Sequence, residues 1–122
     1  KKVLMKLSKV YSWVDEEMFE KYYRDFVEKF SDKEILAISP VYVDEKFFPG
    51  SNRNLKKYRD IISQICSEQK YTHFFDIYSC QEQLGWEEKP SIYGNDHFHP
   101  SKYGYQWMGN ILGEKISQII KD

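Results

Sequence analysis

The sequence predicts an α/β fold in which a short parallel sheet is covered by helices. Short apolar runs that suit buried strands alternate along the chain with longer segments in which apolar side chains recur at helical spacing. The chain has 122 residues, of which 41% are hydrophobic and 17% aromatic. This is enough apolar material for one modest core, so residues 1–122 are expected to form a single domain or part of one.

The first two predicted elements are a strand and a helix. Residues 3–10 alternate apolar and polar side chains and are the candidate first strand. Between Asp15 and Phe30 the apolar and aromatic side chains recur at the spacing of an amphipathic helix. Glu16 and Glu17 follow Asp15 at its start, where the helix dipole favours negative charge. The aromatic side chains of this helix are expected to pack in the core.

The middle of the chain predicts a strand, a helix and a second strand. Residues 34–40 form a short apolar run closed by a proline, as in a strand that is buried on both faces. Residues 41–54 are predicted to be a loop, because they contain the turn sequence Pro-Gly-Ser-Asn. A second helix follows, with its apolar positions between Leu55 and Cys66, and residues 72–78 predict another short strand.

The chain is predicted to end in a third amphipathic helix, preceded by an irregular polar segment at residues 79–95. The side chains of this helix that are expected to face inward are Trp107, Met108, Ile111, Leu112, Ile116, Ile119 and Ile120. Two or three parallel strands leave much of a sheet edge unpaired. We therefore expect the chain to be part of a larger sheet, or one half of a close homodimer.

Charge, hydropathy and cysteine content exclude several classes of function. The 18 basic and 19 acidic residues nearly cancel, so the sequence lacks the basic footprint of a nucleic-acid-binding protein. No apolar run is long enough for a membrane span. Cys66 and Cys80 have neither metal-ligand spacing nor a disulfide framework, and Cys66 is predicted to be a small core residue. Two cysteines leave open whether the protein is cytoplasmic or secreted.

The segment with the most chemical information is the loop before the last helix. Asp96 precedes His99 by three residues, which brings a carboxylate within reach of an imidazole. Such a carboxylate accepts the proton on one ring nitrogen, fixes the tautomer and stabilises the imidazolium ion. The other nitrogen is then available to take a proton from a serine hydroxyl. Pro100 is predicted to lie in the first turn of the helix that follows.

Other interpretations of this region are open. In one, Asp96 caps the last helix and His99 only packs ahead of it. In another, Asp96, His97 and His99 bind a metal ion together with His73, although ligands from one short loop are a weak metal pattern. We expect no metal and no other cofactor, and we expect His97 to be exposed or to support the pair. Three aromatic residues in irregular segments, expected either to line a pocket or to cover the core, are Trp13, Trp86 and Tyr93.

The loop resembles the last sequence block of the SGNH (GDSL-type) serine hydrolases, in which Asp-x-x-His-Pro is followed by Gly-Tyr and an amphipathic helix. The matching residues are Asp96, His99, Pro100, Gly104 and Tyr105, and with the order of elements the resemblance covers most of residues 13–122. It implies part of a three-layer α/β/α, flavodoxin-like fold. It also implies that Asp96 and His99 are catalytic in the hydrolysis of an ester, such as an acylated lipid or an acetylated sugar, without a cofactor.

The chain departs from this family in the residues that complete the site. The family's nucleophilic serine lies in a Gly-Asp-Ser block, and an asparagine of a Gly-x-Asn-Asp block donates to the oxyanion. Neither block is present, and at the corresponding strand Ser8 replaces the glycine, Val10 the asparagine and Tyr11 the aspartate. Valine has no hydrogen-bond donor, and the loss of one oxyanion donor costs about 100- to 1000-fold in rate.

Two expectations about function follow. In the first, the chain is the C-terminal part of an ester hydrolase and supplies Asp96 and His99, while the serine and the oxyanion hole come from elsewhere. In the second, it is a truncated and inactive α/β interaction module that forms a dimer. In both, these residues alone are not a competent esterase.

Overall fold

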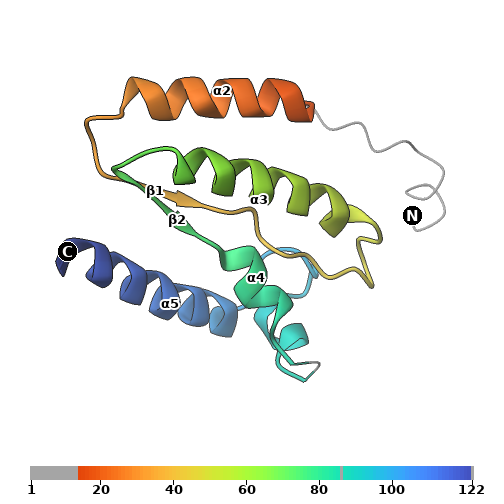
Figure 1. The fold of residues 1–122 in the computed structure, drawn as a ribbon. Coiled ribbons are helices and arrows are strands. Elements are labelled where there is room, and N and C mark those ends of the chain that lie inside the picture. The colour runs from red at the N-terminus through yellow and green to blue at the C-terminus, as the bar shows by residue number, and fades with distance from the viewer. Residues whose placement is uncertain (1–13, 86, 122) are drawn as a thin grey trace.

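The computed structural model describes residues 14–85 and 87–121 (Figure 1). The elements in chain order are α2 (Glu16–Lys29), β1 (Ile35–Ile38), α3 (Ser51–Ser67), β2 (Thr72–Phe75), α4 (Ile77–Glu82), the 3₁₀-helix η1 (Lys89–Ile92) and α5 (Lys102–Lys121). The predicted first strand, residues 3–10, lies outside the described residues.

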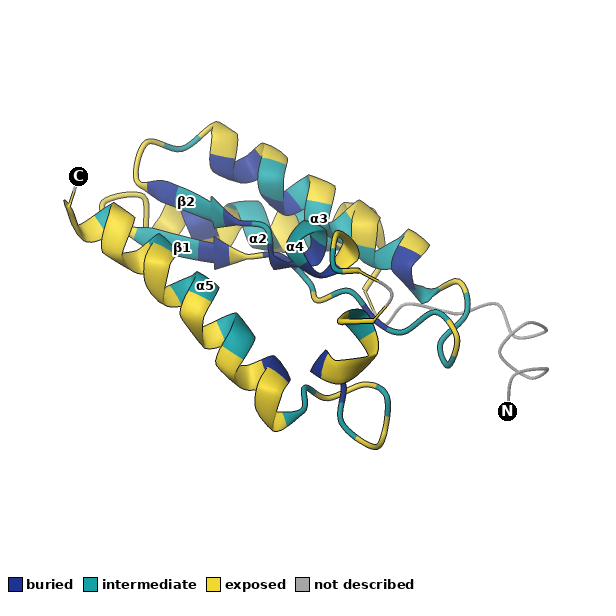
Figure 2. Cartoon of the chain, turned by 90° about the horizontal axis from the view of Figure 1, so that it is seen from below, coloured by how far each residue is buried: buried dark blue, intermediate teal, exposed yellow. Residues whose placement is uncertain are grey.

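β1 and β2 form a parallel two-stranded sheet, and α3 is the crossover between them. Ile35 pairs with Thr72 at one end of the register and Ile38 with Phe75 at the other. Figure 1 shows α2 and α3 on one side of the strands and α5 on the other, and the view from below in Figure 2 agrees. The predicted fold class, a partial three-layer α/β/α arrangement with a short parallel sheet, is confirmed.

The core lies between the sheet and the α2–α3 layer. Ala37 of β1 packs with Ile62 and Cys66 of α3, and all three are buried. Phe19 and Tyr23 of α2 and Phe74 of β2 pack against this cluster. Burial of apolar surface on this scale is the main term that stabilises a small domain. Cys66 is the small core residue that the sequence predicts.

Helix α2 begins where the sequence predicts, because Asp15 is its N-cap. The Asp15 carboxylate accepts a hydrogen bond of 2.8 Å from the N–H of Met18, which satisfies one free donor of the first turn. The prediction that the aromatic side chains pack in the core is wrong for one face of the helix. Tyr22 and Phe26 are 57% and 56% exposed, and Phe30 is also exposed.

Helix α3 begins at Ser51, so the predicted loop over residues 41–54 is wrong at its end. Gly50 adopts a left-handed conformation with φ 83°, which glycine accepts without steric cost. The Glu45 carboxylate accepts hydrogen bonds of 2.6 Å from the N–H of Gly50 and 2.8 Å from that of Asn52. This side chain satisfies donors at the start of the helix, so a turn sequence becomes a helix N-terminus.

The second strand is shorter than predicted, because β2 ends at Phe75 and Asp76 begins a helix. Asp76 accepts a hydrogen bond of 3.1 Å from the N–H of Ser79 and is the N-cap of α4. Arg59 of α3 donates from Nε to both oxygens of the same carboxylate, at 3.0 and 2.9 Å. Residues 79–95, which the sequence predicts to be irregular, contain the rest of α4 and the 3₁₀-helix η1.

Helix α5 covers the other face of the sheet only in part. Figure 2 shows it mostly in the colour of exposed residues. Ile116 and Ile120 line a pocket together with Leu36 of β1, so they lie on the side of α5 that faces the sheet, as predicted, but they are 40% and 78% exposed rather than buried. Ile38 of β1 is 43% exposed, so the strand is not buried on both faces as predicted. In the part of the chain that the structure describes, no helix is both long and apolar enough to cross a bilayer.

Candidate active site

The loop that carries Asp96 and His99 is closed at its base by backbone hydrogen bonds. Tyr93 and Pro100 form an isolated antiparallel bridge, and the N–H of Gly94 donates to the carbonyl of His99 at 2.7 Å. The N–H of Ser101 donates to the carbonyl of Ile92 at 2.8 Å. The loop is therefore held between η1 and α5. Pro100 lies before α5 rather than in its first turn, which corrects the prediction.

The side chains of Asp96 and His99 meet within this loop. Oδ2 of Asp96 lies 2.6 Å from Nδ1 of His99. Because a carboxylate only accepts, the proton of this hydrogen bond belongs to Nδ1. Oδ1 of Asp96 accepts the N–H groups of Phe98 at 3.0 Å and of His99 at 2.9 Å. The two carboxylate oxygens therefore act differently, since one orients the imidazole and the other shapes the backbone.

These hydrogen bonds stabilise the charged form of Asp96. The bond from His99, followed by those from the two backbone N–H groups, lowers the pKa of Asp96 to about 2. The carboxylate is therefore ionised at any neutral pH. Nε2 of His99 has no partner among the described residues, and the His99 side chain is 70% exposed. It is accessible to a group that approaches from outside the loop.

Asp96 does not cap the last helix. Its hydrogen bonds all stay within its own loop. Ser101 caps α5 instead, because its Oγ accepts a hydrogen bond of 3.0 Å from the N–H of Gly104 in the first turn of the helix. The capping interpretation is therefore wrong.

The metal interpretation is not supported either. Among the residues that the structure describes, no three His, Cys, Asp or Glu side chains are placed to hold a metal ion. His73 is engaged elsewhere, with Nε2 2.6 Å from Oε2 of Glu34. His97 is half-buried, and its ring stacks on Phe47.

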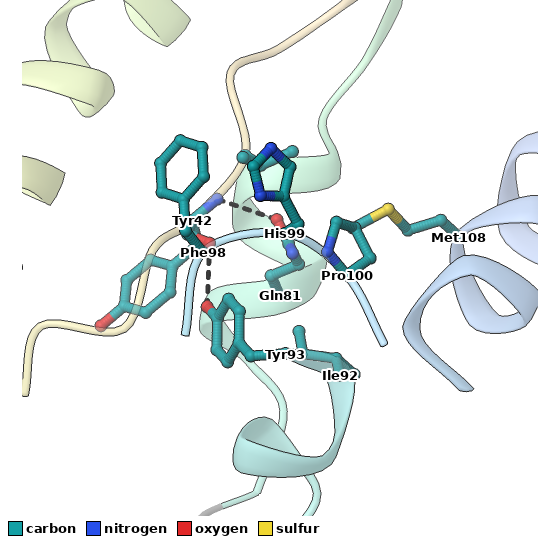
Figure 3. Close-up of a pocket in the computed structure, with 9 residues that line it drawn as sticks. Tyr42, Gln81, Ile92, Tyr93, Phe98, His99, Pro100 and Met108 are labelled. Atoms are coloured by element: carbon teal, nitrogen blue, oxygen red, sulfur yellow. Dashed lines mark hydrogen bonds between the residues drawn. The ribbon is translucent and has the colours of Figure 1, made fainter. Parts of the chain in front are cut away.

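An apolar pocket of about 120 Å³ lies beside His99 (Figure 3). It is lined by Val41, Tyr42, Gln81, Ile92, Tyr93, Phe98, His99, Pro100 and Met108. It is slightly smaller than a cavity of roughly 150 Å³ that binds benzene, so a short hydrocarbon group fits. Its lining comes from the loop after β1, from α4, from the segment around η1 and from α5, which meet only in the folded chain.

The polar groups of the pocket wall are paired with each other. The N–H of Tyr42 donates to Oε1 of Gln81 at 2.8 Å, and the Tyr93 hydroxyl donates to the carbonyl of Tyr42 at 2.8 Å. Burial raises the pKa of Tyr93, so its phenol stays neutral. Tyr93 is the pocket residue that the sequence suggests, whereas Trp13 and Trp86 lie outside the described residues. Gln81 carried no sequence signal, because it lies in a helix that the sequence does not predict.

The candidate site contains no described nucleophile. Ser101, the serine next to Pro100, donates its hydroxyl to the carbonyl of Ser91 at 2.6 Å. Ser8, which stands at the family's glycine position, lies outside the described residues. The site as described therefore comprises an oriented histidine and a pocket.

No protein-family model matches the sequence, and no curated protein matches it. The fold is similar to the crystal structure of the lipase/acylhydrolase from Enterococcus faecalis, with a TM-score of 0.75 and 15% sequence identity. The similar region covers 86% of this chain and 53% of that chain. The protein therefore has a lipase/acylhydrolase-like α/β fold and spans about half the length of that protein.

Proposed function

We propose that this chain is the C-terminal part of an SGNH (GDSL-type) ester hydrolase and supplies its Asp96–His99 pair. The observation that carries the proposal is the 2.6 Å contact between Nδ1 of His99 and Oδ2 of Asp96 on an accessible loop. The lipase/acylhydrolase-like fold supports it.

In this mechanism His99 is the general base. Asp96 holds the proton on Nδ1, so Nε2 presents a lone pair that takes the proton of a serine hydroxyl as the oxygen attacks the ester carbonyl. The same Nε2 then returns the proton to the departing alcohol. Asp96 stays ionised throughout and stabilises the imidazolium ion. The ester substrate is an acylated lipid or an acetylated sugar. The pocket beside His99 would receive the apolar part of this substrate.

The nucleophile and the oxyanion hole are supplied outside the described residues. Among these residues β1 pairs only with β2, so the side of β1 away from β2 is available to a further parallel strand. In an α/β sheet, ligands bind at the carboxyl ends of the strands. A segment that extends the sheet next to β1 would bring its own loop to the same end as the loop of His99.

Hydrolysis of 4-nitrophenyl acetate and butyrate by the full-length gene product tests the proposal. We expect turnover that His99→Ala reduces to background and that Asp96→Asn reduces by about 10⁴-fold, as loss of the orienting carboxylate does in a serine hydrolase triad. His73→Ala is the matched control, because this histidine pairs with Glu34 rather than with the loop. Unchanged turnover in His99→Ala would refute the assignment.

A second candidate function is a non-catalytic interaction module that forms a homodimer. The observation that favours it is an apolar stripe along the outer face of α2, formed by Met18, Tyr22, Phe26 and Phe30, all of them exposed. Contiguous exposed apolar surface of this kind marks an interaction site. This candidate predicts a dimer in sedimentation and no hydrolysis by the full-length product, and a well-folded monomer contradicts it.

A further inference from the structure

The loop between β1 and α3 contacts the loop of Asp96 and His99 through two consecutive phenylalanines. The ring of Phe47 stacks on the ring of His97, with centroids 3.5 Å apart and planes 7° from parallel. The ring of Phe48 makes an edge contact with Phe98 at 5.6 Å and 67°. The contact between Phe48 and Phe98 has the edge geometry that aromatic pairs favour, whereas Phe47 and His97 lie face to face at van der Waals contact.

These contacts fall on the two residues that separate Asp96 from His99. The N–H of Phe98 donates to Oδ1 of Asp96 at 3.0 Å, and the ring of Phe98 meets the imidazole of His99 edge-on at 5.1 Å and 84°. A displacement of Phe98 therefore moves both the carboxylate and the imidazole.

His97 adopts an unusual backbone conformation. Its φ of 58° makes it the one non-glycine residue in the left-handed region within the described ranges. This conformation is uncommon for residues other than glycine, and it persists only where the surroundings enforce it. The stack on Phe47 supplies such an enforcing contact.

The loop that presents the two phenylalanines is itself anchored. The N–H groups of Phe47 and Phe48 donate to the carbonyl of Asp44 at 3.0 and 2.8 Å. The buried side chain of Asn52 pairs with both backbone groups of Val43, at 2.9 Å to its N–H and 2.7 Å to its carbonyl. A side chain held on a fixed support is able to orient a partner loop.

We propose that Phe47 and Phe48 are positioning residues that hold the loop of Asp96 and His99 in the conformation in which carboxylate and imidazole meet. Their importance for catalysis rests on the proposed function, whereas the positioning is a property of the folded chain. Asp96 and His99 are exposed, so burial does not hold them together. Surface ion pairs are weak without such support.

NMR of Asp96 and His99 in the folded chain tests this proposal without a substrate. In the wild type the hydrogen bonds from His99 and from the backbone N–H groups lower the pKa of the Asp96 carboxyl to about 2. We expect Phe47→Ala to raise this pKa toward the ordinary aspartate value of about 3.9, because the hydrogen bonds from His99 and the backbone are made for less of the time. At mildly acidic pH the low-field Nδ1 proton signal of His99 is expected to broaden in the same variant.

Two further variants separate positioning from general stability. Phe47→Leu keeps an apolar side chain but removes the stack, so it is expected to shift the pKa of Asp96 as Phe47→Ala does. Phe47→Tyr keeps the stack and is expected to restore a pKa of about 2. The matched control is Phe30→Ala, which removes an exposed ring that packs on Phe26 in α2, far from the loop in sequence.

The proposal is overturned if the Phe47→Leu variant is folded, as judged by circular dichroism, and keeps both the wild-type pKa of Asp96 and the Nδ1 proton signal of His99. This outcome is distinct from failure of the proposed function. If the variants shift the pKa as expected but the full-length product hydrolyses no ester, the positioning stands and the esterase assignment fails.

Discussion

Single residues decide how the loop of Asp96 and His99 is placed against the rest of the fold. Gly104 is the clearest case, because it is the one described residue of α5 that is buried. A Cβ atom there would lie 2.2 Å from the carbonyl oxygen of Ile92. The close approach of α5 to η1, which fixes both ends of the loop, therefore requires glycine at this position.

Gly104→Ala tests this requirement. Because the clash is with backbone, α5 and η1 must separate, and we expect a loss of about 1–3 kcal/mol in the free energy of unfolding measured with urea. Gly109→Ala, in the same helix, is the control, because a Cβ atom added at Gly109 would meet nothing within 4 Å. It is expected to stabilise the protein by up to about 1 kcal/mol through helix propensity. Equal effects of the two changes would contradict the packing role of Gly104.

Single residues also explain why the Asp96–His99 pair of the candidate site could be predicted from the sequence. Asp96 and His99 are three positions apart, so the contact between them is local and needs only a turn of the right shape. The pocket beside His99 could not be predicted from the sequence, because Val41 and Met108 are distant in sequence and line the same pocket only when the sheet and α5 have packed together.

At the scale of elements, caps decide where strands end and helices begin. Asp76 follows β2, begins α4 and binds Arg59 of α3, so one carboxylate joins three elements. Burial acts to raise the pKa of Asp76, but the hydrogen bonds from Arg59 and Ser79 outweigh it and the pKa is lowered. The charged form is therefore the one that stabilises the fold.

Asp76→Ala is expected to destabilise the protein by about 2 kcal/mol, because α4 loses its cap and the half-buried Arg59 loses its main acceptor. Denaturant unfolding at neutral pH measures this loss. Asp25→Ala, at an exposed position of α2, serves as control and is expected to change stability by less than about 0.5 kcal/mol. A loss in Asp76→Ala no larger than in the control would show that the cap has little weight.

Apolar spacing predicts long helices but neither short helices nor the residue at which a helix begins. The helix periodicity of α2 and α5 predicts where these helices lie, since apolar spacing repeats over many residues. The short helix α4 is not predicted, because six residues offer too few turns for a periodic signal. The early start of α3 is not predicted either, since a Glu45 side chain converts a turn sequence into a helix start.

At the scale of the whole molecule, the described part of the chain leaves apolar surface uncovered on two sides. Met18, Tyr22, Phe26 and Phe30 are exposed on α2, and Ile116 and Ile120 are exposed on α5. A surface of this kind favours association with another polypeptide. Both proposed functions require such a partner surface, either for the remainder of a hydrolase domain or for a second copy.

Phe26→Glu is expected to reduce association without unfolding the protein. Phe26 is 56% exposed and contacts Phe30, so its replacement removes little core packing while it places a charge within the apolar stripe. Sedimentation velocity is expected to show a smaller assembly than the wild type, with an unfolding free energy within about 1 kcal/mol of it. Lys56→Glu, at an exposed position of α3 away from the stripe, is the control. An unchanged assembly state in Phe26→Glu would exclude α2 as the association surface.

For the described residues, the sequence by itself determined the α/β class, the order of the two strands and the long helices, and the local pair of Asp96 and His99. Each depends on neighbours within a few positions, where spacing along the chain fixes spacing in space. Only the tertiary structure decided which faces stay exposed, where α3 and α4 begin, and that Phe47 and Phe48 lie against His97 and Phe98. Those outcomes depend on contacts between segments that are distant in sequence. Such contacts form, and contribute to stability, only once the chain has folded.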